Sequence, residues 1–201
     1  MPSRPSSSAP ARRAAHEVRI IGGAWKRTRL PVVDKPGLRP TPDRVRETLF
    51  NWLGQDLTGW RCVDAFAGTG ALGLEAASRG AAQVLLVEQD PDLVATLRAL
   101  RARLQAEGVE VRRANGLTVL KDLAGSGQDL ILLDPPFEAD LFDKAVAAAA
   151  PALRDGGFLY LEAPHRWSEA ALQAHGLQLQ RHLKAGAVHA HLLSRSVPPG
   201  P

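Results

Sequence analysis

The chain has few of the features that mark a secreted or membrane-spanning protein. Its 201 residues include one cysteine, Cys62, so no disulfide framework can form and nothing indicates an oxidising compartment. Its apolar runs are far shorter than the roughly 18–20 residues that a membrane-spanning helix needs. The first residues also lack the apolar stretch of a secretory signal. We therefore expect a cytoplasmic protein that has no membrane partner.

The composition is that of an ordinary globular protein. Hydrophobic residues make up 45% of the chain and charged residues 23%. A chain of this length is expected to form one domain with a small appendage and to bury a sizeable core. No internal repeat is apparent, and we take a monomer as the default state.

Positive charge is concentrated near the N-terminus. Residues 1–46 contain 11 Lys and Arg residues and three acidic ones, a net charge of +8, whereas the rest of the chain carries −4. This distribution is typical of a basic arm that meets a polyanion, although a solvated surface would explain the charge equally well. The segments we predict are a disordered basic tail over 1–15, an N-terminal β extension over 16–37, a main domain over 38–196 and a frayed end over 197–201.

Strand and helix patterns alternate along the main domain. Thr41 and Pro42 predict the start of a helix that runs to about Leu53, with Thr41 as its N-cap. The further strands are predicted over 60–66, 84–88, 109–113, 130–133 and 157–162, and the helices over 71–79, 91–104, 117–123, 141–150 and 167–175. Two final strands, 177–183 and 188–194, are predicted to form a hairpin across 184–187. The fold class is therefore α/β, with a mostly parallel sheet, helices on both faces and one antiparallel strand near the edge.

Ligands of such sheets bind at the carboxyl ends of the strands, so the residues that follow each strand are the candidate site. Asp64 ends the first core strand and is followed by Gly68, Gly70 and Gly73. These glycines allow a ligand to approach the backbone at a helix N-terminus. The spacing is a weak signal alone, but an acid at the entrance favours a cationic or amine-bearing ligand over a phosphate.

The next two strands end in residues that suit a nucleoside. Glu88 follows Gly70 by 18 residues, and its carboxylate can accept hydrogen bonds from both hydroxyls of a ribose. Asn115 can donate to and accept from an adenine edge, although an Asn before a Gly is more often a turn residue.

The most informative motif is Asp134-Pro135-Pro136-Phe137, which follows a buried strand. The prolines make a rigid loop whose carbonyls are free to accept hydrogen bonds. Phe137 offers a flat stacking surface. The Asp134 carboxylate and the Pro135 carbonyl would together accept both hydrogens of an exocyclic amine on a planar base.

Together these residues resemble the class I S-adenosylmethionine-dependent methyltransferases. Within them the chain resembles the bacterial RsmD family of 16S rRNA (guanine-N2)-methyltransferases, through Arg19–Gly23, Leu38–Thr41 and Asp43–Leu53, over roughly residues 17–195. The resemblance implies a Rossmann-like fold with a seven-stranded sheet, S-adenosylmethionine as the cofactor and 16S rRNA in a small-subunit particle as the partner. Asn115 differs from the Asp of many relatives in the superfamily, and His189 and His191 stand where the family would have a tyrosine.

The resemblance also assigns the site residues. The cofactor would be held by Thr41, Asp64, Phe66, Gly68, Thr69, Gly70, Glu88, Gln89, Asn115, Gly116 and Asp134. Asp134, Pro135 and Phe137 would be catalytic. The substrate would be contacted by Pro136, Arg19, Lys26, Arg27, Arg39 and Arg44, and the extension over 16–37 would contact RNA. No metal is expected.

Three alternatives remain open at this point. One is an adenine-N6 methyltransferase, which uses a similar Asp-Pro-Pro-aromatic loop but for which 201 residues leave no separate target-recognition domain. Another is a nicotinamide-dependent oxidoreductase, in which Asp64 and the Asp134–Phe137 loop have no obvious use. The third is a non-catalytic RNA-binding assembly factor.

Overall fold

The structure, a computed structural model, describes residues 18–33, 35, 40–136 and 141–196. The predicted segments 1–15 and 197–201, and the candidate residues Arg39 and Phe137, lie outside this part of the chain. The strands are β1 (Val18–Arg19), β2 (Arg29–Leu30), β3 (Arg61–Asp64), β4 (Gln83–Glu88), β5 (Val109–Arg113), β6 (Gln128–Leu133), β7 (Leu153–Ala163), β8 (Leu177–Ala185) and β9 (Val188–Arg195). The helices are α1 (Asp43–Trp52), α2 (Ala71–Ser78), α3 (Pro91–Arg103), α4 (Gly116–Asp122), α5 (Leu141–Ala149), the 3₁₀ turn η1 (Ala150–Ala152) and α6 (Glu169–Gln173).

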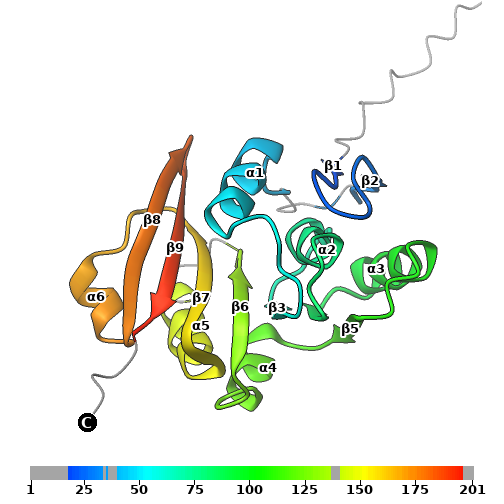
Figure 1. The fold of residues 1–201 in the computed structure, drawn as a ribbon. Helices are drawn as coiled ribbons and strands as arrows, with labels where there is room; N and C mark the ends of the chain where they lie inside the picture. The colour runs from blue at the N-terminus through cyan, green and yellow to red at the C-terminus, as the bar shows by residue number, and fades with distance from the viewer. Residues whose placement is uncertain (1–17, 34, 36–39, 137–140, 197–201) are drawn as a thin grey trace, which may run out of the picture.

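One seven-stranded sheet forms the centre of the molecule, in the order β5-β4-β3-β6-β7-β9-β8 (Figure 1). Strands β3 to β7 pair in parallel, and β9 runs antiparallel between β7 and β8. The terminal hairpin thus supplies one antiparallel strand, which confirms the predicted fold class. The chain leaves β3 toward β4 and β5 on one side and continues at β6 on the other, so the topological switch point lies between β3 and β6.

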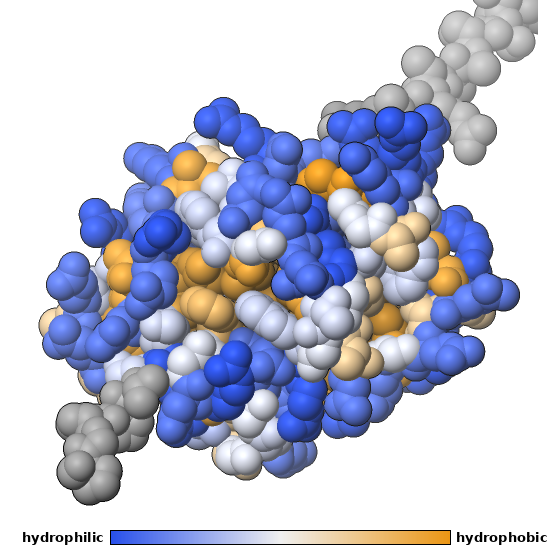
Figure 2. All heavy atoms as spheres, viewed as in Figure 1, coloured by the Kyte–Doolittle hydropathy of each residue, from blue (hydrophilic) through white to orange (hydrophobic). Residues whose placement is uncertain are grey.

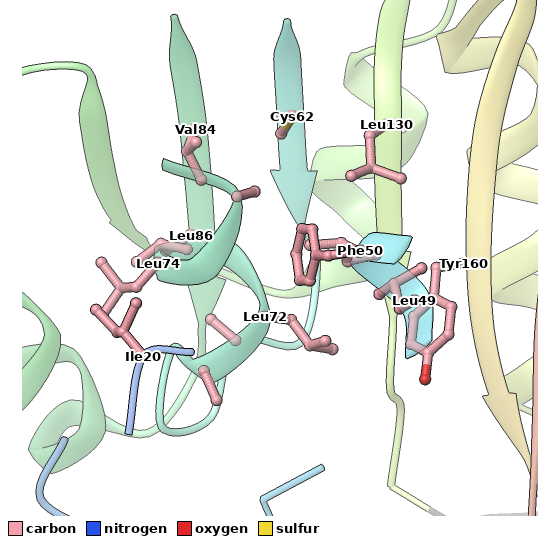
Figure 3. Packing of buried hydrophobic residues seen from close by; sticks show 14 of the residues in the cluster. Ile20, Leu49, Phe50, Cys62, Leu72, Leu74, Val84, Leu86, Leu130 and Tyr160 are labelled. Carbon is pink, nitrogen blue, oxygen red and sulfur yellow. The ribbon is translucent and has the colours of Figure 1, made fainter. Parts of the chain in front are cut away.

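Helices cover both faces of the sheet, because alternate residues of each strand point to opposite faces. The first apolar core contains residues of α1, α2 and α3 together with Cys62, Leu86, Leu130 and Tyr160 (Figure 3). The second core contains residues of α4, α5 and α6 together with Val63 and Ile131. Strand β6 therefore reads as a continuous apolar run because both of its faces are covered.

The surface in view is mainly hydrophilic, and apolar side chains gather over the β7–β9 side of the sheet (Figure 2). None of the helices in the described part of the chain has the length and apolar character needed to cross a membrane.

The short β1–β2 extension is fastened to α2 by buried polar groups. The Glu75 carboxylate accepts hydrogen bonds from the backbone N–H groups of Ile21 (2.7 Å) and Gly22 (2.8 Å). Ser78 accepts from the Trp25 N–H (2.9 Å), and a Cβ on Gly23 would lie 1.8 Å from the Ser78 carbonyl oxygen. The extension is thus docked on the main domain.

Two local predictions were wrong. Pro42, not Thr41, is the N-cap of α1, and no side chain caps this helix. Thr41 is only 4% exposed, and its hydroxyl donates instead to Glu162 (2.6 Å). The predicted helix over 167–175 begins later, because the Ser168 hydroxyl caps α6 by accepting from the Ala171 N–H.

Candidate functional site

The candidate site lies at the carboxyl ends of the parallel strands, on both sides of the switch point. Asp64 ends β3, Glu88 ends β4, Asp134 follows β6 and Glu162 lies near the end of β7. Four carboxyl groups therefore meet at one edge of the sheet, on elements whose backbones are fixed by strand pairing. The structure brings together the acids that the strand-end argument singled out, and it adds Glu162.

Asp64 caps α2 with one oxygen and leaves the other without a partner. Its Oδ2 accepts from the Gly73 N–H (2.9 Å), in the first turn of the helix. Its Oδ1 is buried and has no hydrogen-bond partner in the described part of the chain. Burial raises the pKa of Asp64 to about 7, and the Gly73 N–H partly opposes this rise. Such an acceptor is suited to a ligand that brings a cation or a donor.

The glycine turn is shaped by close approach as well as by backbone conformation. Gly68 and Gly70 adopt φ of 51° and 78°, a region that other residues rarely enter. A Cβ on Gly70 would lie 2.6 Å from Leu97 Cδ2, and one on Gly73 would lie 2.2 Å from Leu86 Cδ2. No side chain caps α2 from Gly70, the residue before the helix, so ligand groups can meet bare backbone there.

Glu88 organises the turn from the neighbouring strand. Its Oε2 accepts from the Gly68 N–H (2.9 Å), and its Oε1 accepts from the N–H groups of Gln89 (2.7 Å) and Asp90 (2.9 Å). A carboxylate offers about four acceptor positions, so three are used and about one is left for a ribose hydroxyl. The predicted ribose contact thus remains compatible with the geometry.

Asn115 is the N-cap of α4, a local structural role of the kind expected for an Asn that precedes a Gly. Its Oδ1 caps α4 by accepting from the Thr118 N–H (3.1 Å), and its amide lies 3.5 Å from Gln89 Oε1. A Cβ on Gly116 would lie 2.2 Å from the Ala65 carbonyl oxygen, so α4 can begin here only because this residue is a glycine. The predicted adenine contact stays a prediction, and it would now depend on the amide donor of Asn115.

Asp134 and the residues around it form the most strongly perturbed part of the site. Asp134 is half-buried, Pro135 is buried and Pro136 is exposed. Burial, followed by the charges of Glu162 and Asp64, raises the pKa of Asp134 well above its usual value. Asp134 is therefore a stronger base than an ordinary aspartate.

Glu162 was missed by the sequence analysis. It is 4% exposed, and its Oε1 accepts from Thr41 Oγ1 (2.6 Å) and from the Tyr160 hydroxyl (2.9 Å). The signal was available, because Glu162 lies at the end of a predicted strand, as Glu88 does. Applying the strand-end argument to that strand would have found it.

Glu75 was also missed. Arg46, one of the basic residues of segment 1–46 that could contact phosphates, is buried, so that prediction was wrong for it. No local pattern distinguishes the two residues from surface charges on a helix. Arg46 is fully buried and donates to the Thr41 carbonyl (3.2 Å), to Asp43 Oδ1 (2.6 Å) and to Glu75 Oε2 (3.4 Å). Arg46 therefore holds the backbone of Thr41 in place through its hydrogen bond to the Thr41 carbonyl.

The predicted RNA-contacting residues are exposed where the structure describes them. Lys26, Arg27 and Arg44 are exposed, and Arg19 pairs with Asp43 at 3.0 Å with two-thirds of its side chain still accessible. The other residues predicted to hold the cofactor lie near the carboxyl ends of β3 and β4: Phe66, Thr69 and Gln89.

The histidines on the last strands face the second core. The buried His191 accepts from the Trp167 N–H (3.2 Å) and lies 3.3 Å from the Leu161 carbonyl, to which its other ring nitrogen must donate. Burial lowers the pKa of His191 to about 4, so this ring is neutral. No group of three or more potential ligands that could hold a metal occurs among the described residues.

The chain matches known proteins over most of its length. The family model described as "Conserved hypothetical protein 95" matches residues 18–194. Ribosomal RNA small subunit methyltransferase D of Escherichia coli K12 is 43% identical over 154 residues, which cover 77% of this chain and 75% of that protein. The protein of the same name from Haemophilus influenzae Rd is 40% identical over 154 residues, 74% of this chain and 80% of that protein.

A solved structure gives the same answer for the fold. The yhhF protein of Escherichia coli superimposes with a TM-score of 0.76 at 36% identity, over 90% of this chain and 98% of that chain. The family match covers nearly all of the described residues, and the superposition agrees with a class I methyltransferase fold. The chain belongs to the RsmD family of class I S-adenosylmethionine-dependent methyltransferases.

Proposed function

We propose that the chain transfers a methyl group from S-adenosylmethionine to the exocyclic N2 of a guanine in the 16S rRNA of the small ribosomal subunit. The curated relatives are named as small-subunit rRNA methyltransferases, which supports ribosomal RNA as the substrate. The observation that carries the choice of an exocyclic amine is the pair of acceptors after β6, the Asp134 carboxylate and the Pro135 carbonyl.

The residues present fit the cofactor. The unpartnered Oδ1 of Asp64 suits a cationic or amine-bearing group, and the remaining acceptor position of Glu88 suits a ribose hydroxyl. Gly68 and Gly70 adopt positive φ, and this turn presents the unshielded start of α2 to a ligand. When bound, S-adenosylmethionine supplies an electrophilic methyl group and a neutral thioether as the leaving group.

The protein's part in the reaction is to orient the amine and stabilise its developing charge. The lone pair of a guanine amine is delocalised into the ring, so the amine is a poor nucleophile. Hydrogen bonds from the two N2 hydrogens to Asp134 and Pro135 would favour a tetrahedral nitrogen and stabilise the positive charge that forms there. Holding both reactants in place can lower the barrier by up to about 7–11 kcal/mol.

The target base must leave its stack to reach this pocket, which costs a few kcal/mol. We propose that Phe137 replaces part of the lost stacking and that Pro136 borders the base. Arg19, Lys26, Arg27, Arg39 and Arg44 would contact phosphates, and such contacts position RNA without reading its sequence. Binding of RNA should therefore weaken steeply as salt rises.

The setting follows from the substrate. We propose that the enzyme acts in the cytoplasm, as a monomer, on a particle of the small subunit. An assay that compares naked 16S rRNA with small-subunit particles lacking the modification would distinguish the two forms of the substrate. Faster methylation of naked rRNA would overturn the proposal for the particle.

The test of the function is Asp134→Ala, with Asp122→Ala as its matched control. Asp122 is exposed at the end of α4, away from the strand ends that form the site. We expect Asp134→Ala to lower methyl transfer by about 10²-fold or more while binding of RNA persists. The control should keep its activity.

Two outcomes would overturn the proposal. Unchanged methylation by Asp134→Ala would remove Asp134 from the mechanism, and RNA binding without any methylation by the wild-type protein would favour a binding factor. Nucleoside analysis of the wild-type product should give N2-methylguanosine, and N6-methyladenosine would show that the base is adenine.

A further inference from the structure

Glu162 is a buried acid of the site that the mechanism above does not use. We propose that Glu162 is a positioning residue that makes Asp134 the general base of the reaction, the group that takes the proton lost by guanine N2. This inference rests on the proposed function, in which Asp134 accepts a hydrogen bond from that amine.

The register of the sheet places the two acids side by side. Leu132 of β6 pairs with Tyr160 of β7, and Leu133 pairs with Leu161, on parallel strands about 4.8 Å apart. Asp134 and Glu162 are the next residues along their strands. Because the side-chain period of a strand is two, both lie on the face of Leu132 and Tyr160.

A third acid flanks Asp134 on its other side. Asp64 of β3 pairs with Leu132, so it lies on the same face and one row earlier. Asp134 is thus between two buried carboxyl groups, each on a neighbouring strand. Two like charges at such distances cannot both form without a large cost, and one of the groups keeps its proton to a higher pH.

Hydrogen bonding decides which group ionises first. Glu162 accepts from Thr41 (2.6 Å) and from Tyr160 (2.9 Å), and these bonds favour its charged form. Burial raises the pKa of Glu162, while Thr41, Tyr160 and the charge of Arg46 oppose the rise. For Asp134, Thr41 is the one group that opposes the rise in pKa caused by burial and the neighbouring acids, and the single hydroxyl proton of Thr41 is donated to Glu162. Glu162 is therefore the better stabilised anion, and Asp134 is the member of the pair that binds a proton more readily.

The charged groups around Asp134 come from three sides. The titratable and charged residues that face it or its partners are Asp64 on β3, Tyr160 and Glu162 on β7, and Arg46 on α1, with Asp43 and Glu75 paired to Arg46. The single positive charge of this set is already paired with two other carboxylates. The field at Asp134 is thus dominated by negative charge, which stabilises a bound proton.

The reaction needs such a base. The bond from the methyl carbon to N2 forms as the bond from that carbon to sulfur breaks, and the electron pair of the broken bond stays on sulfur. N2 then carries the positive charge and loses a proton to the Asp134 carboxylate, which passes it to water when the products leave. A carboxylate with a raised affinity for protons accepts this proton more readily than an ordinary aspartate.

The test is the pH profile of Glu162→Gln, which keeps the shape and one acceptor oxygen but loses the charge. Activity requires ionised Asp134, so kcat rises as pH rises through the pKa of that group. Removing the neighbouring negative charge lowers this pKa, and we expect the acidic limb of the kcat profile to move down by about one pH unit. On the plateau above the acidic limb, where Asp134 is ionised in both proteins, the weaker base should lower kcat roughly threefold to tenfold with KM unchanged.

Two further variants separate this role from a structural one. Tyr160→Phe keeps the carboxylate but removes one hydrogen bond to it, so it should move the acidic limb in the same direction by less. It also provides the test if Glu162→Gln fails to fold. Glu107→Gln, which removes one exposed charge in the loop before β5, should leave the profile unchanged.

An acidic limb that stays in place in both site variants would overturn the inference. That is the result expected if Glu162 only anchors Thr41. This failure is distinct from failure of the proposed function. If Asp134→Ala methylates RNA as fast as the wild type, the proposed role of Asp134 is wrong, and if the wild-type product is not N2-methylguanosine, the proposed function is wrong. If Asp134→Ala is inactive and the limb does not move, only the role of Glu162 is wrong.

Discussion

The strongest prediction for stability concerns Glu75, which joins three parts of the fold. Its carboxylate accepts from the backbone of the extension at Ile21 and Gly22 and pairs with Arg46 (3.4 Å) and Arg79 (2.8 Å). Glu75 and Arg46 are fully buried, and the Arg79 side chain is 6% exposed. Glu75→Gln would leave two buried guanidinium groups without their shared anion.

The size of the effect follows from this burial. Removing one partner of a buried ion pair costs about 3–5 kcal/mol, because the remaining charge is uncompensated. For a domain of this size each kcal/mol lowers Tm by about 2–4 °C, so Tm should fall by roughly 6–20 °C. The extension should also detach more easily from α2. Trypsin should then cleave faster at Lys26 and Arg27, whose side chains are already exposed.

The assay is urea unfolding followed by tryptophan fluorescence, together with limited trypsin digestion. The control is Glu47→Gln, which removes the same charge from an exposed position on α1 and should change stability by less than about 0.5 kcal/mol. A loss below about 1 kcal/mol for Glu75→Gln, with no faster cleavage in the extension, would refute the reasoning.

Three other changes have definite expected outcomes. Gly73→Ala places a Cβ 2.2 Å from Leu86 Cδ2, so unfolding free energy should fall by about 1–3 kcal/mol in a denaturant titration. Gly116→Ala, whose Cβ would meet the Ala65 carbonyl oxygen at 2.2 Å, should shift α4 and weaken S-adenosylhomocysteine binding in calorimetry. Asp64 has a pKa of about 7 when folded against an ordinary 3.8, so its contribution to wild-type stability should fall as pH rises from about 4 to about 7, by up to about 4 kcal/mol. Asp64→Asn should flatten this dependence in thermal unfolding at several pH values, and an unchanged slope would contradict the burial argument.

The strands and the edge that holds the site could be predicted from sequence because their signals are local. Strand 109–113 has the predicted bounds, and Asp90 caps α3 as its sequence indicates. The short apolar run in β6 identified a strand covered on both faces. From these elements the rule for parallel sheets brought Asp64, Glu88 and Asp134 to one edge.

The rest depended on contacts between residues far apart in sequence. Thr41 has the residue type and position of an N-cap, but a carboxylate 121 residues away takes its hydroxyl. Glu75 and Arg46 occupy helix positions where charges usually face water, and only the packing of the extension against α1 and α2 buries them. No pattern within one segment carries this information.

The crowding of acids at the strand ends is costly for folding and useful for chemistry at the same time. Burial raises the pKa of Asp64, Asp134 and Glu162, and neighbouring carboxylates add to the rise at Asp64 and Asp134. A stable core would replace such groups with apolar side chains of similar size. Here one oxygen of Asp64 is left unpartnered beside the glycine turn, and Asp134 is left as a strong acceptor. A cationic ligand beside Asp64 and an amine beside Asp134 would each stabilise these carboxylates. They are the two chemical groups that an amine methyltransferase brings together.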